Sequence, residues 1–347
     1  MNLFITGASG FIGKQVLSQL APKCNKIFLL SRTKSLLKTK EFFKEFDNIT
    51  FIEGDITQDE VVKNIEDLKL LQNNVNTVLN IAGHYDIEVS ELDSYKTNII
   101  GLQNIINLSL QFSKLTIFHH ISSYVAAGSE EKILKETTLG NAKKFGDYYS
   151  RSKMQGEVIL KKSALSKIKI RIYRPGIVIG SSESGNIEKT DGPYYFMKFI
   201  NKYQEILKHL NQLKVFPLPF NQTAILPLIP VDILSNWLCE AVVNPTKHKI
   251  RTYHLVSKEQ IKLKDFVEWL FKEYSIDLKL TQLPESDIYK HLLPTLGMPK
   301  ELLQYMYYDS KLDISNKEED YPHHQSYALE DITSNLIKGS KRFFKES

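Results

Sequence analysis

Three glycines spaced three residues apart near the start of the chain constrain its fold more than any other feature. They lie in TGASGFIG, residues 6–13. Apolar residues precede this stretch and apolar residues at helical spacing follow it, so we expect a tight turn from a strand into a helix. Such a turn directs backbone N–H groups and a helix N-terminus toward one spot, which suits an anion such as a pyrophosphate. A glycine-rich connection without a ligand has the same local pattern, so the rest of the chain must decide.

Apolar runs typical of buried strands alternate with amphipathic helical segments through the first half of the chain. The predicted strands are 3–5, 26–31, 48–56, 77–83, 115–123 and 168–175. Five helices are predicted between and after these strands. The first starts at Phe11, the second contains Phe42, Phe43 and Phe46, and the third contains Val61, Val62, Ile65 and Leu68. The fourth spans residues 92–112 and the fifth spans residues 147–166. Because parallel strands need crossover helices, this order predicts an α/β fold with a Rossmann-type doubly wound parallel sheet.

The pattern changes after Pro175. An irregular segment leads into the aromatic stretch DGPYYFMKF, residues 191–199, and a late strand at 252–257 is expected to return to the main sheet. The segment 260–347 reads as mostly helical and polar. We therefore expect a dinucleotide-binding domain and a smaller C-terminal α-rich substrate-binding lobe. The first comprises residues 1–178 and is completed by about 225–258, and the second comprises 179–224 and 259–347.

The composition of the 347 residues is that of an ordinary globular protein, and it excludes several classes of function. The net charge of +5 comes from scattered lysines and not from a dense basic block, so we expect no nucleic-acid partner. Cys24 and Cys239 give neither a disulfide framework nor a zinc spacing, which indicates a reducing, cytoplasmic location. The nine histidines have no metal-ligand spacing, so we expect no metal.

Targeting and membrane segments are not expected either. The first strand begins within three residues of Met1, which leaves no room for a signal or transit peptide. No run of about eighteen apolar residues exists, so we expect no transmembrane span.

The stretch DYYSRSKMQGE, residues 147–157, places Tyr149 and Lys153 four residues apart on a predicted helix, so the two side chains share a face. A nearby ammonium favours the phenolate and lowers the pKa of the phenol toward working pH, which suits proton transfer. The same ammonium can hydrogen-bond a ribose. An exposed helix face has the same spacing, so the order of the other motifs carries the functional interpretation.

The stretch HHISSYVAAG, residues 119–128, ends the fifth predicted strand. Open α/β sheets bind ligands at the carboxyl ends of their strands, so a hydroxyl here can donate a hydrogen bond to a carbonyl or a developing alkoxide. Ser123 is the candidate, and Ser122 competes with it. A hydroxyl at a strand end also commonly caps a helix or a turn. His84 and Tyr85 follow the fourth strand and can face the same site.

With these motifs in order, the chain resembles the extended short-chain dehydrogenase/reductase family over roughly residues 1–260. The motifs that carry the resemblance are TGASGFIG at 6–13, Asp55 after the third strand, Asn80-Ile81-Ala82-Gly83 at the fourth, Asn98 on the next helix, Ser123, Tyr149 with Lys153, and Arg174-Pro175-Gly176 after the sixth strand. The pair Gly101-Leu102 departs from the Gly-Thr of many members, which bears on helix packing.

The resemblance implies a nicotinamide dinucleotide cofactor and assigns residues to the reaction. It implies that Tyr149 is the general acid, that Lys153 lowers the pKa of Tyr149 and holds the ribose, and that Ser123 hydrogen-bonds the carbonyl. The implied cofactor-binding residues are Gly7, Ser9, Gly10, Phe11, Ile12, Gly13, Ser31, Arg32, Asp55, Ile56, Ala82, Gly83, Asn98, Tyr149, Lys153 and Pro175.

The end of the second strand sets the expected form of that cofactor. Family members that prefer NAD place Asp or Glu there to bind the ribose 2′-hydroxyl. This chain has Leu30-Ser31-Arg32 instead, where Arg32 can pair with a 2′-phosphate and Ser31 can bond it. We therefore expect NADP(H) to be preferred over NAD(H). If Arg32 only stacks on the adenine, the preference stays open.

A narrower resemblance concerns the substrate. Residues 174–200, RPGIVIGSSESGNIEKTDGPYYFMKFI, and residues 226–234, LPLIPVDIL, are similar to the reductase domains of fatty acyl-CoA reductases and thioester reductases. This similarity implies NADPH-dependent reduction of an acyl thioester or another lipid-like carbonyl. The aromatic stretch 194–199 then either lines a pocket for a lipid-like substrate or forms the core of the smaller lobe.

Other functions of the same fold stay open. The wider neighbourhood of the family contains 3β-hydroxysteroid dehydrogenases, flavonol reductases and sugar-nucleotide epimerases, and a non-catalytic NADP-binding regulator would also use the fold. The apolar stretch DGPYYFMKF argues against a sugar nucleotide, and the complete set of Ser123, Tyr149 and Lys153 argues for turnover. A small-molecule substrate is the expected partner, and homodimers are common in the family that the chain resembles.

Overall fold

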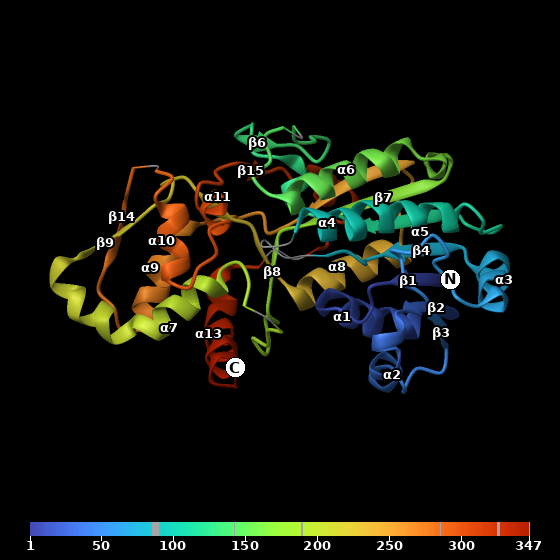
Figure 1. Cartoon of the computed structure of the whole chain (residues 1–347), viewed down its shortest axis with the longest axis horizontal. Coiled ribbons are helices and arrows are strands. Elements are labelled where there is room, and N and C mark those ends of the chain that lie inside the picture. Colours follow the sequence, from blue (N-terminus) through green and yellow to red (C-terminus); the bar gives the residue numbers. More distant parts are fainter. Residues whose placement is uncertain (85–89, 142, 189, 285, 325–326, 347) are drawn as a thin grey trace.

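The computed structural model describes residues 1–84, 90–141, 143–188, 190–284, 286–324 and 327–346. Two parts lie side by side in Figure 1: a sheet with flanking helices, and a smaller lobe built from the later part of the chain. No helix in the described part of the chain is long and apolar enough to cross a membrane.

The central sheet has seven parallel strands in the order β12-β7-β5-β4-β1-β2-β3. The strands are β1 (Asn2–Thr6), β2 (Lys26–Ser31), β3 (Ile49–Glu53), β4 (Thr77–Asn80), β5 (Ile117–Ile121), β7 (Lys169–Pro175) and β12 (Ile250–Leu255). The chain order reverses beside β1, which confirms the predicted Rossmann-type doubly wound sheet. The late strand β12 returns to the edge of this sheet, where Ile250 lies opposite Ile170 of β7.

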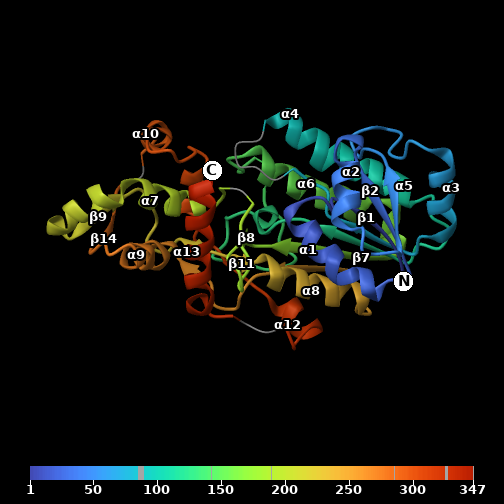
Figure 2. The ribbon, with the colours of Figure 1, turned by 90° about the horizontal axis from the view of Figure 1, so that it is seen from below.

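Each face of the sheet packs against its own helices, because successive strand residues point to opposite faces. Leu3 and Ile5 of β1 lie in the core shared with α1 and α8. Phe4 lies in the opposite core, shared with α3, α5 and α6. Figure 2 shows α1 and α8 side by side against the strands. These helices are α1 (Phe11–Leu20), α3 (Ile65–Asn74), α5 (Gly101–Ser109), α6 (Tyr148–Lys162) and α8 (Val231–Val243).

The smaller lobe has a hydrophobic core of its own. Phe196, Phe266 and Leu336 from three different helices are almost completely buried in it. The segment 260–347 contributes to this core because its apolar residues recur at helical spacing on the buried faces of its helices. The lobe contains α7 (Tyr194–His209), α9 (Leu263–Glu273), α10 (Tyr289–Thr295), α11 (Leu302–Met306), α13 (Leu329–Glu346), and the parallel pair β9 (Val215–Leu218) and β14 (Lys279–Gln282).

Two predicted helices differ in detail from the observed ones. The helix predicted from Val61 begins only at Ile65, because the Asn64 side chain caps it by accepting a hydrogen bond from the N–H of Glu66 at 2.8 Å. Val62 instead pairs with Gly54 in an isolated β-bridge. The helix predicted at 92–112 consists of α4 (Glu91–Ser94), the π-helical segment η2 (Tyr95–Ile100) and α5.

The remaining elements are one further helix beside the sheet and several short segments. They are α2 (Thr33–Phe42), α12 (Ser315–Asp320), β6 (Ile133–Leu134), β8 (Ile177–Ile179), β10 (Ile225–Leu226), β11 (Leu228–Pro230), β13 (Ile261–Lys262), β15 (Lys311–Leu312), and the 3₁₀ turns η1 (Ala21–Lys23), η3 (Tyr124–Ala127), η4 (Ala164–Lys167) and η5 (Leu210–Leu213).

Candidate active site

A cavity of about 790 Å³ opens at the carboxyl ends of the parallel strands. Residues that follow β1, β2, β3, β4, β5 and β7 line it, because parallel strands bring their carboxyl ends to one edge of a sheet. Residues of α7, α9 and α11 line its other side. Every residue predicted to act in catalysis or to bind the cofactor lines this cavity except Asn98.

The turn after β1 is built around two glycines. Gly7 has a φ of +74°, and a Cβ on it would lie 2.5 Å from the backbone nitrogen of Ala82. A Cβ on Gly13 would lie 2.2 Å from the carbonyl oxygen of Gly7. Gly10 precedes α1, and a Cβ there would make only an ordinary contact at 3.5 Å. The exposed backbone of Gly10 and the N-terminus of α1 therefore leave space for a pyrophosphate, and the turn fits a dinucleotide.

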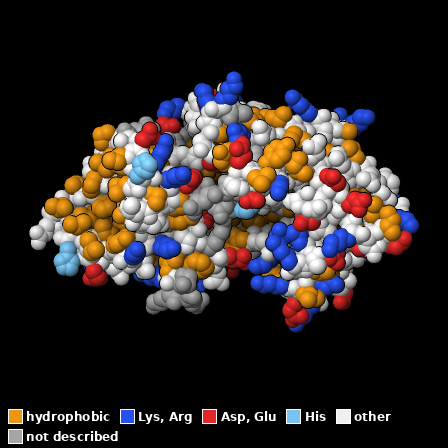
Figure 3. Space-filling view, in the orientation of Figure 1, with side chains coloured by type: hydrophobic (Ala, Val, Ile, Leu, Met, Phe, Trp, Pro, Cys, Tyr) orange, Lys and Arg blue, Asp and Glu red, His pale blue; other side chains and the backbone are white. Residues whose placement is uncertain are grey.

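The end of the cavity next to β2 is basic. Arg32, which the sequence suggests as the partner of a 2′-phosphate, lines it and is exposed. Lys34 and Ser35 line it too, although no motif marks them, because α2 begins at the cavity edge. Figure 3 shows Lys and Arg side chains gathered over the region of α1 and α2. The local field thus favours an anion.

Two polar side chains at this end are already held by the protein. The hydroxyl of Ser31 lies 3.3 Å from that of Ser35 and donates to Oγ1 of Thr39 at 3.5 Å, so it is less free than the sequence suggests. The Oδ1 atom of Asp55 accepts hydrogen bonds from the N–H and the hydroxyl of Thr57, both at 2.9 Å. These bonds fix the Asp55 carboxylate at the cavity wall.

Ser123, Tyr149 and Lys153 lie together where β5 ends beside α6. The Ser123 hydroxyl and the Tyr149 phenol share a hydrogen bond. Burial raises the pKa of Tyr149 well above its ordinary value, and the bond to Ser123 acts in the opposite direction. The nearby carboxylates of Asp147 and Asp191 also raise the pKa of Tyr149, whereas the sequence-based expectation that Lys153 lowers it stays a prediction. The phenol is protonated at neutral pH and can act as an acid.

The two adjacent serines have different partners. Ser122 donates a hydrogen bond to Oε1 of the buried Glu157 at 2.7 Å, whereas Ser123 contacts Tyr149. Neighbouring residues of an extended chain point to opposite sides, so only one of two adjacent hydroxyls reaches the phenol. The geometry therefore favours Ser123 over Ser122 as the hydroxyl that meets a substrate carbonyl.

Lys153 lies in the wall between α6 and β5. Its Nζ donates to the carbonyl oxygen of Ile121 at 3.2 Å and lies 5.8 Å from the centre of the Tyr149 ring. A Cβ on Gly83 would lie 3.0 Å from this nitrogen, so the chain after β4 approaches it closely. Burial lowers the pKa of Lys153 to about 8, and the carboxylate of Glu157 acts to raise it.

Asn98 lies behind the cavity wall. Its Oδ1 accepts a hydrogen bond from the N–H of His84 at 2.9 Å, and its Nδ2 donates to the His84 carbonyl at 3.2 Å and to the Ser152 hydroxyl at 2.9 Å. Asn98 thus anchors His84, which lines the cavity as the sequence suggests. Tyr85 lies outside the described residues.

The part of the cavity that faces the lobe is largely apolar. Phe196, Leu263, Leu302 and Met306 line it. Tyr194 and Phe196 belong both to the core of the lobe and to the cavity wall, so the two roles considered for the aromatic stretch occur together. Sequence analysis missed Leu302, Tyr305 and Met306, because α11 carries no motif and only the tertiary fold brings it to the sheet.

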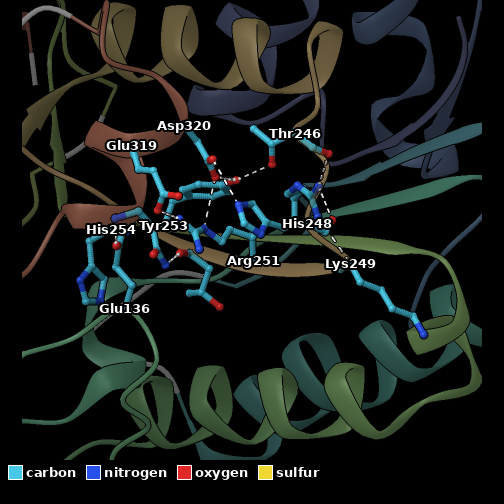
Figure 4. A network of polar contacts seen from close by, with 12 residues as sticks. Glu136, Thr246, His248, Lys249, Arg251, Tyr253, His254, Glu319 and Asp320 are labelled. Atoms are coloured by element: carbon cyan, nitrogen blue, oxygen red, sulfur yellow. Dashed lines mark hydrogen bonds and ion pairs between the residues drawn. The ribbon is translucent and has the colours of Figure 1, made fainter.

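A polar network beside β12 contains a group of potential metal ligands, His248, Glu319 and Asp320 (Figure 4). The guanidinium of Arg251 pairs with Glu319 and lies 3.2 Å from Oδ2 of Asp320. The Tyr253 hydroxyl also donates to Asp320 at 2.8 Å. Because the arginine already balances the carboxylates, the group has the character of an ion-pair network that ties α12 to β12.

The fold and this site together define the class of protein. The sheet is parallel and has a glycine turn after its first strand, and a Tyr and a Lys lie one helical turn apart beside a serine at a strand end. These are the features of an extended short-chain dehydrogenase/reductase with a nicotinamide cofactor. Comparison with known families agrees with that class. The NAD-binding family described as male sterility protein matches residues 5–238, and the chain belongs to this family.

Two relatives illustrate the similarity in sequence. The chain is 26% identical over 283 residues to fatty acyl-CoA reductase 1 of Xenopus laevis, which covers 68% of this chain and 53% of that protein. It is 25% identical over 327 residues to the nonribosomal peptide synthetase asaC of Aspergillus flavus, which covers 87% of this chain and 30% of the synthetase. The chain thus spans about half the length of the reductase and less than a third of the synthetase.

Solved structures share the fold. The terminal R domain from the myxalamid PKS-NRPS biosynthetic pathway has a TM-score of 0.77 at 19% identity, covering 99% of this chain and 91% of that domain. A UDP-glucose-4-epimerase from Stenotrophomonas maltophila with bound NAD has a TM-score of 0.71 at 15% identity, covering 100% of both chains.

Proposed function

We propose that the protein reduces the carbonyl group of an acyl thioester, or of another lipid-like carbonyl compound, with NADPH. The observation that carries this proposal is one cavity that combines the glycine turn, the Ser123–Tyr149–Lys153 set and an apolar wall from the lobe. An apolar wall next to a proton donor suits a carbonyl on a hydrophobic chain. The sequence similarity to a fatty acyl-CoA reductase supports the same substrate class.

We propose that the two domains predicted from the sequence bind the cofactor and the substrate, respectively. Residues 1–178, completed by about 225–258, would bind the dinucleotide, and residues 179–224 and 259–347 would bind the substrate. The position of the glycine turn on one side of the cavity and of α7, α9 and α11 on the other supports this division. The residues Gly7, Gly10, Gly13, Asp55 and Pro175 would hold the dinucleotide on the sheet side.

When bound, the reduced nicotinamide supplies a hydride to the carbonyl carbon. Ser123 donates a hydrogen bond to the carbonyl oxygen and so orients the carbonyl. Tyr149 gives its proton to the same oxygen as negative charge develops there. The buried ammonium of Lys153 stabilises the phenolate that remains and can bind the ribose hydroxyls.

We propose NADPH in place of NADH because of the residues after β2. The strand ends at Ser31, and the cations of Arg32 and Lys34 line the cavity directly beyond it. Two cations suit the 2′-phosphate that distinguishes NADPH from NADH. A reducing, cytoplasmic location is part of the proposal and is supported by Cys24 and Cys239, both of which are free and buried.

The test is NADPH oxidation by the purified protein against three groups of substrates: long-chain acyl thioesters, sterol-like ketones and a sugar nucleotide. We expect turnover on a thioester, slower with NADH, and a loss of about a hundredfold or more in kcat for Tyr149→Phe with unchanged NADPH affinity. Turnover only on a ketone or a sugar nucleotide would contradict the proposed thioester substrate but would still support the proposed catalytic residues. Tight NADPH binding without turnover on any group would favour a cofactor-binding regulator.

A further inference from the structure

Glu157 is a fully buried carboxylate on α6, one helical turn beyond Lys153. Its Oε1 accepts hydrogen bonds from Ser122 at 2.7 Å and from Nε of Arg174 at 2.7 Å, and its Oε2 accepts from Nη2 of Arg174 at 2.8 Å. Lys161 lies 3.3 Å from the same Oε2. Burial alone would raise the pKa of Glu157, but Arg174 outweighs it and holds the pKa near 2, so the group is a carboxylate.

The partners of Glu157 are the chain neighbours of proposed site residues. Ser122 precedes Ser123 at the end of β5, and Arg174 precedes Pro175 at the end of β7. Lys153 lies four residues before Glu157 on the same face of α6. One carboxylate therefore joins the two strand ends to the helix that carries Tyr149.

We propose that Glu157 is a positioning residue that holds Ser123, Lys153 and Pro175 in their relative places through its bonds to Ser122 and Arg174. This inference rests on the proposed function, because that function defines the reaction that these residues serve. The contacts of Glu157 themselves do not depend on it. A buried charge pair is costly to assemble unless its geometry is well satisfied. Here both carboxylate oxygens of Glu157 and each of the three guanidinium nitrogens of Arg174 have a hydrogen-bond partner.

The network continues away from the cavity. Nη1 of Arg174 lies 3.2 Å from Nε2 of His254, and Nδ1 of His254 lies 2.7 Å from the carbonyl oxygen of Asp313. Because Nδ1 must donate to that carbonyl, Nε2 accepts from the arginine and the ring is neutral. The buried carboxyl group of Glu136 accepts hydrogen bonds from the N–H of His254 at 2.8 Å and from the N–H of Asn316. Figure 4 shows Glu136 and His254 beside this part of β12. These contacts hold His254 in place, and His254 in turn holds Nη1 of Arg174, the guanidinium nitrogen that does not contact Glu157.

The ionisable groups that face Lys153 are few in the described residues. Tyr149 and Glu157 lie on its own helix, and His120 faces it from β5. His120 is buried with its pKa lowered to about 3, so it is neutral at working pH. Glu157 is thus the anion that favours the ammonium form of Lys153, and its removal should move the loss of that ammonium to lower pH.

The first test is Ser122→Ala, which removes one bond to Glu157 and leaves no buried charge unpaired. We expect kcat to fall about tenfold with little change in KM for the thioester, the effect of losing one hydrogen bond to a charged group. NADPH binding, measured by fluorescence titration, should weaken in parallel. Ser109→Ala is the matched control, because Ser109 is equally buried and its hydroxyl has no hydrogen-bond partner among the described residues. A Ser122→Ala protein that loses only thermal stability would overturn the proposal.

The second test is the double variant Glu157→Gln with Arg174→Met, which removes both charges and so avoids the unpaired arginine of the single variant. NADPH affinity is measured from neutral pH to about pH 9.5, a range that brackets the titration of a buried lysine. In the wild type, affinity should fall as the pH rises through about 8 and Lys153 loses its proton. In the double variant the same fall should occur at lower pH.

These readouts separate the two proposals. If the wild type turns over no thioester but the double variant still shifts the pH profile of NADPH binding, the proposed function fails and the positioning role stands. If the two pH profiles coincide while the melting temperature falls, Glu157 is a structural residue only and the inference is refuted.

Discussion

Gly10 and Gly13 lie three residues apart in the turn after β1, but a methyl group on them meets different surroundings. On Gly13 it would lie 2.2 Å from the carbonyl oxygen of Gly7, and on Gly10 it would lie 3.5 Å from the same atom. We expect Gly13→Ala to lower the free energy of unfolding by about 1–3 kcal/mol, because backbone must move to admit it. Gly10→Ala should keep the melting temperature and weaken NADPH binding. Thermal unfolding and NADPH titration check both, and an equal loss of stability would contradict this assignment.

Arg32 decides which form of the cofactor is bound, if its guanidinium meets the 2′-phosphate. We expect Arg32→Ala to raise the Kd for NADPH about tenfold and to leave the Kd for NADH unchanged, since only NADPH carries the phosphate. Lys38→Ala is the control, because Lys38 is an exposed cation on the same helix that does not line the cavity. Equal weakening of both cofactors would mean that Arg32 stacks on the adenine instead.

At the scale of elements, α6 carries Tyr149, Lys153 and Glu157, so its N-terminus must be well fixed. Asp147 caps it by accepting hydrogen bonds from the N–H of Ser150 at 2.7 Å and from the Ser150 hydroxyl at 2.6 Å, and Gln304 of α11 donates to the same carboxylate at 3.0 Å. We expect Asp147→Ala to lower the free energy of unfolding by about 1–2 kcal/mol and to lower kcat as well.

The control for this cap is Asn64→Ala, which removes the cap of α3 far from the cavity. It should lower stability to a similar extent and leave kcat unchanged, whereas Asp147→Asn should retain most of the stability. Thermal unfolding and steady-state kinetics measure both effects. A loss of kcat in Asn64→Ala as large as in Asp147→Ala would show that the effect is not local to α6.

The elements that could be predicted are those whose burial leaves a local pattern. The strands of the central sheet are buried on both faces, so a segment such as KIFLLS is recognisable as an apolar run. The start of α3 was misplaced because Val61 and Val62 continue the helical spacing, while the cap at Asn64 sets the true beginning. Which of Ser122 and Ser123 meets Tyr149 depends on how the chain faces after β5 ends. The family resemblance predicts Ser123, whereas the local pattern of two adjacent serines does not distinguish them.

At the scale of the whole molecule, the cavity is made by segments that are far apart in the chain. Its glycine turn comes from the first thirteen residues, and α11 at Leu302–Met306 lies on the opposite wall. The motifs for the dinucleotide side are local turns with fixed residue types, so the sequence predicts them. The apolar wall has no fixed residue types, because any apolar side chain of suitable size fills it. The aromatic stretch 194–199 is therefore the part of this wall that the sequence suggests, and Leu263, Leu302 and Met306 appear only in the folded structure.

The same compact fold buries His119, His120 and His254, and this predicts how the protein responds to acid. Burial lowers the pKa of each to about 3 and that of the buried His324 to about 4, against an ordinary value of 6.5. Burial also raises the pKa of Glu136 to about 8, and this group opposes the histidines because its folded form holds a proton that the unfolded chain releases above about pH 4.5. As the pH falls below 6.5 the unfolded chain takes up protons that the folded protein does not, so stability is complete above that pH and is lost progressively toward pH 3. Each histidine should contribute about 1.4 kcal/mol per pH unit in this window.

Urea unfolding at about pH 7.5, 6.5 and 5.5 measures this dependence, in a range above the titration of ordinary carboxyl groups. We expect the free energy of unfolding to change little between the first two values and to fall steeply between the last two. His120→Asn removes one of the four buried rings and should reduce that slope by up to about 1.4 kcal/mol per pH unit, since the contributions of the histidines add. His323→Asn, at an exposed position, should leave the slope of the wild type unchanged. Equal slopes for His120→Asn and the wild type would mean that these buried rings do not control the acid response.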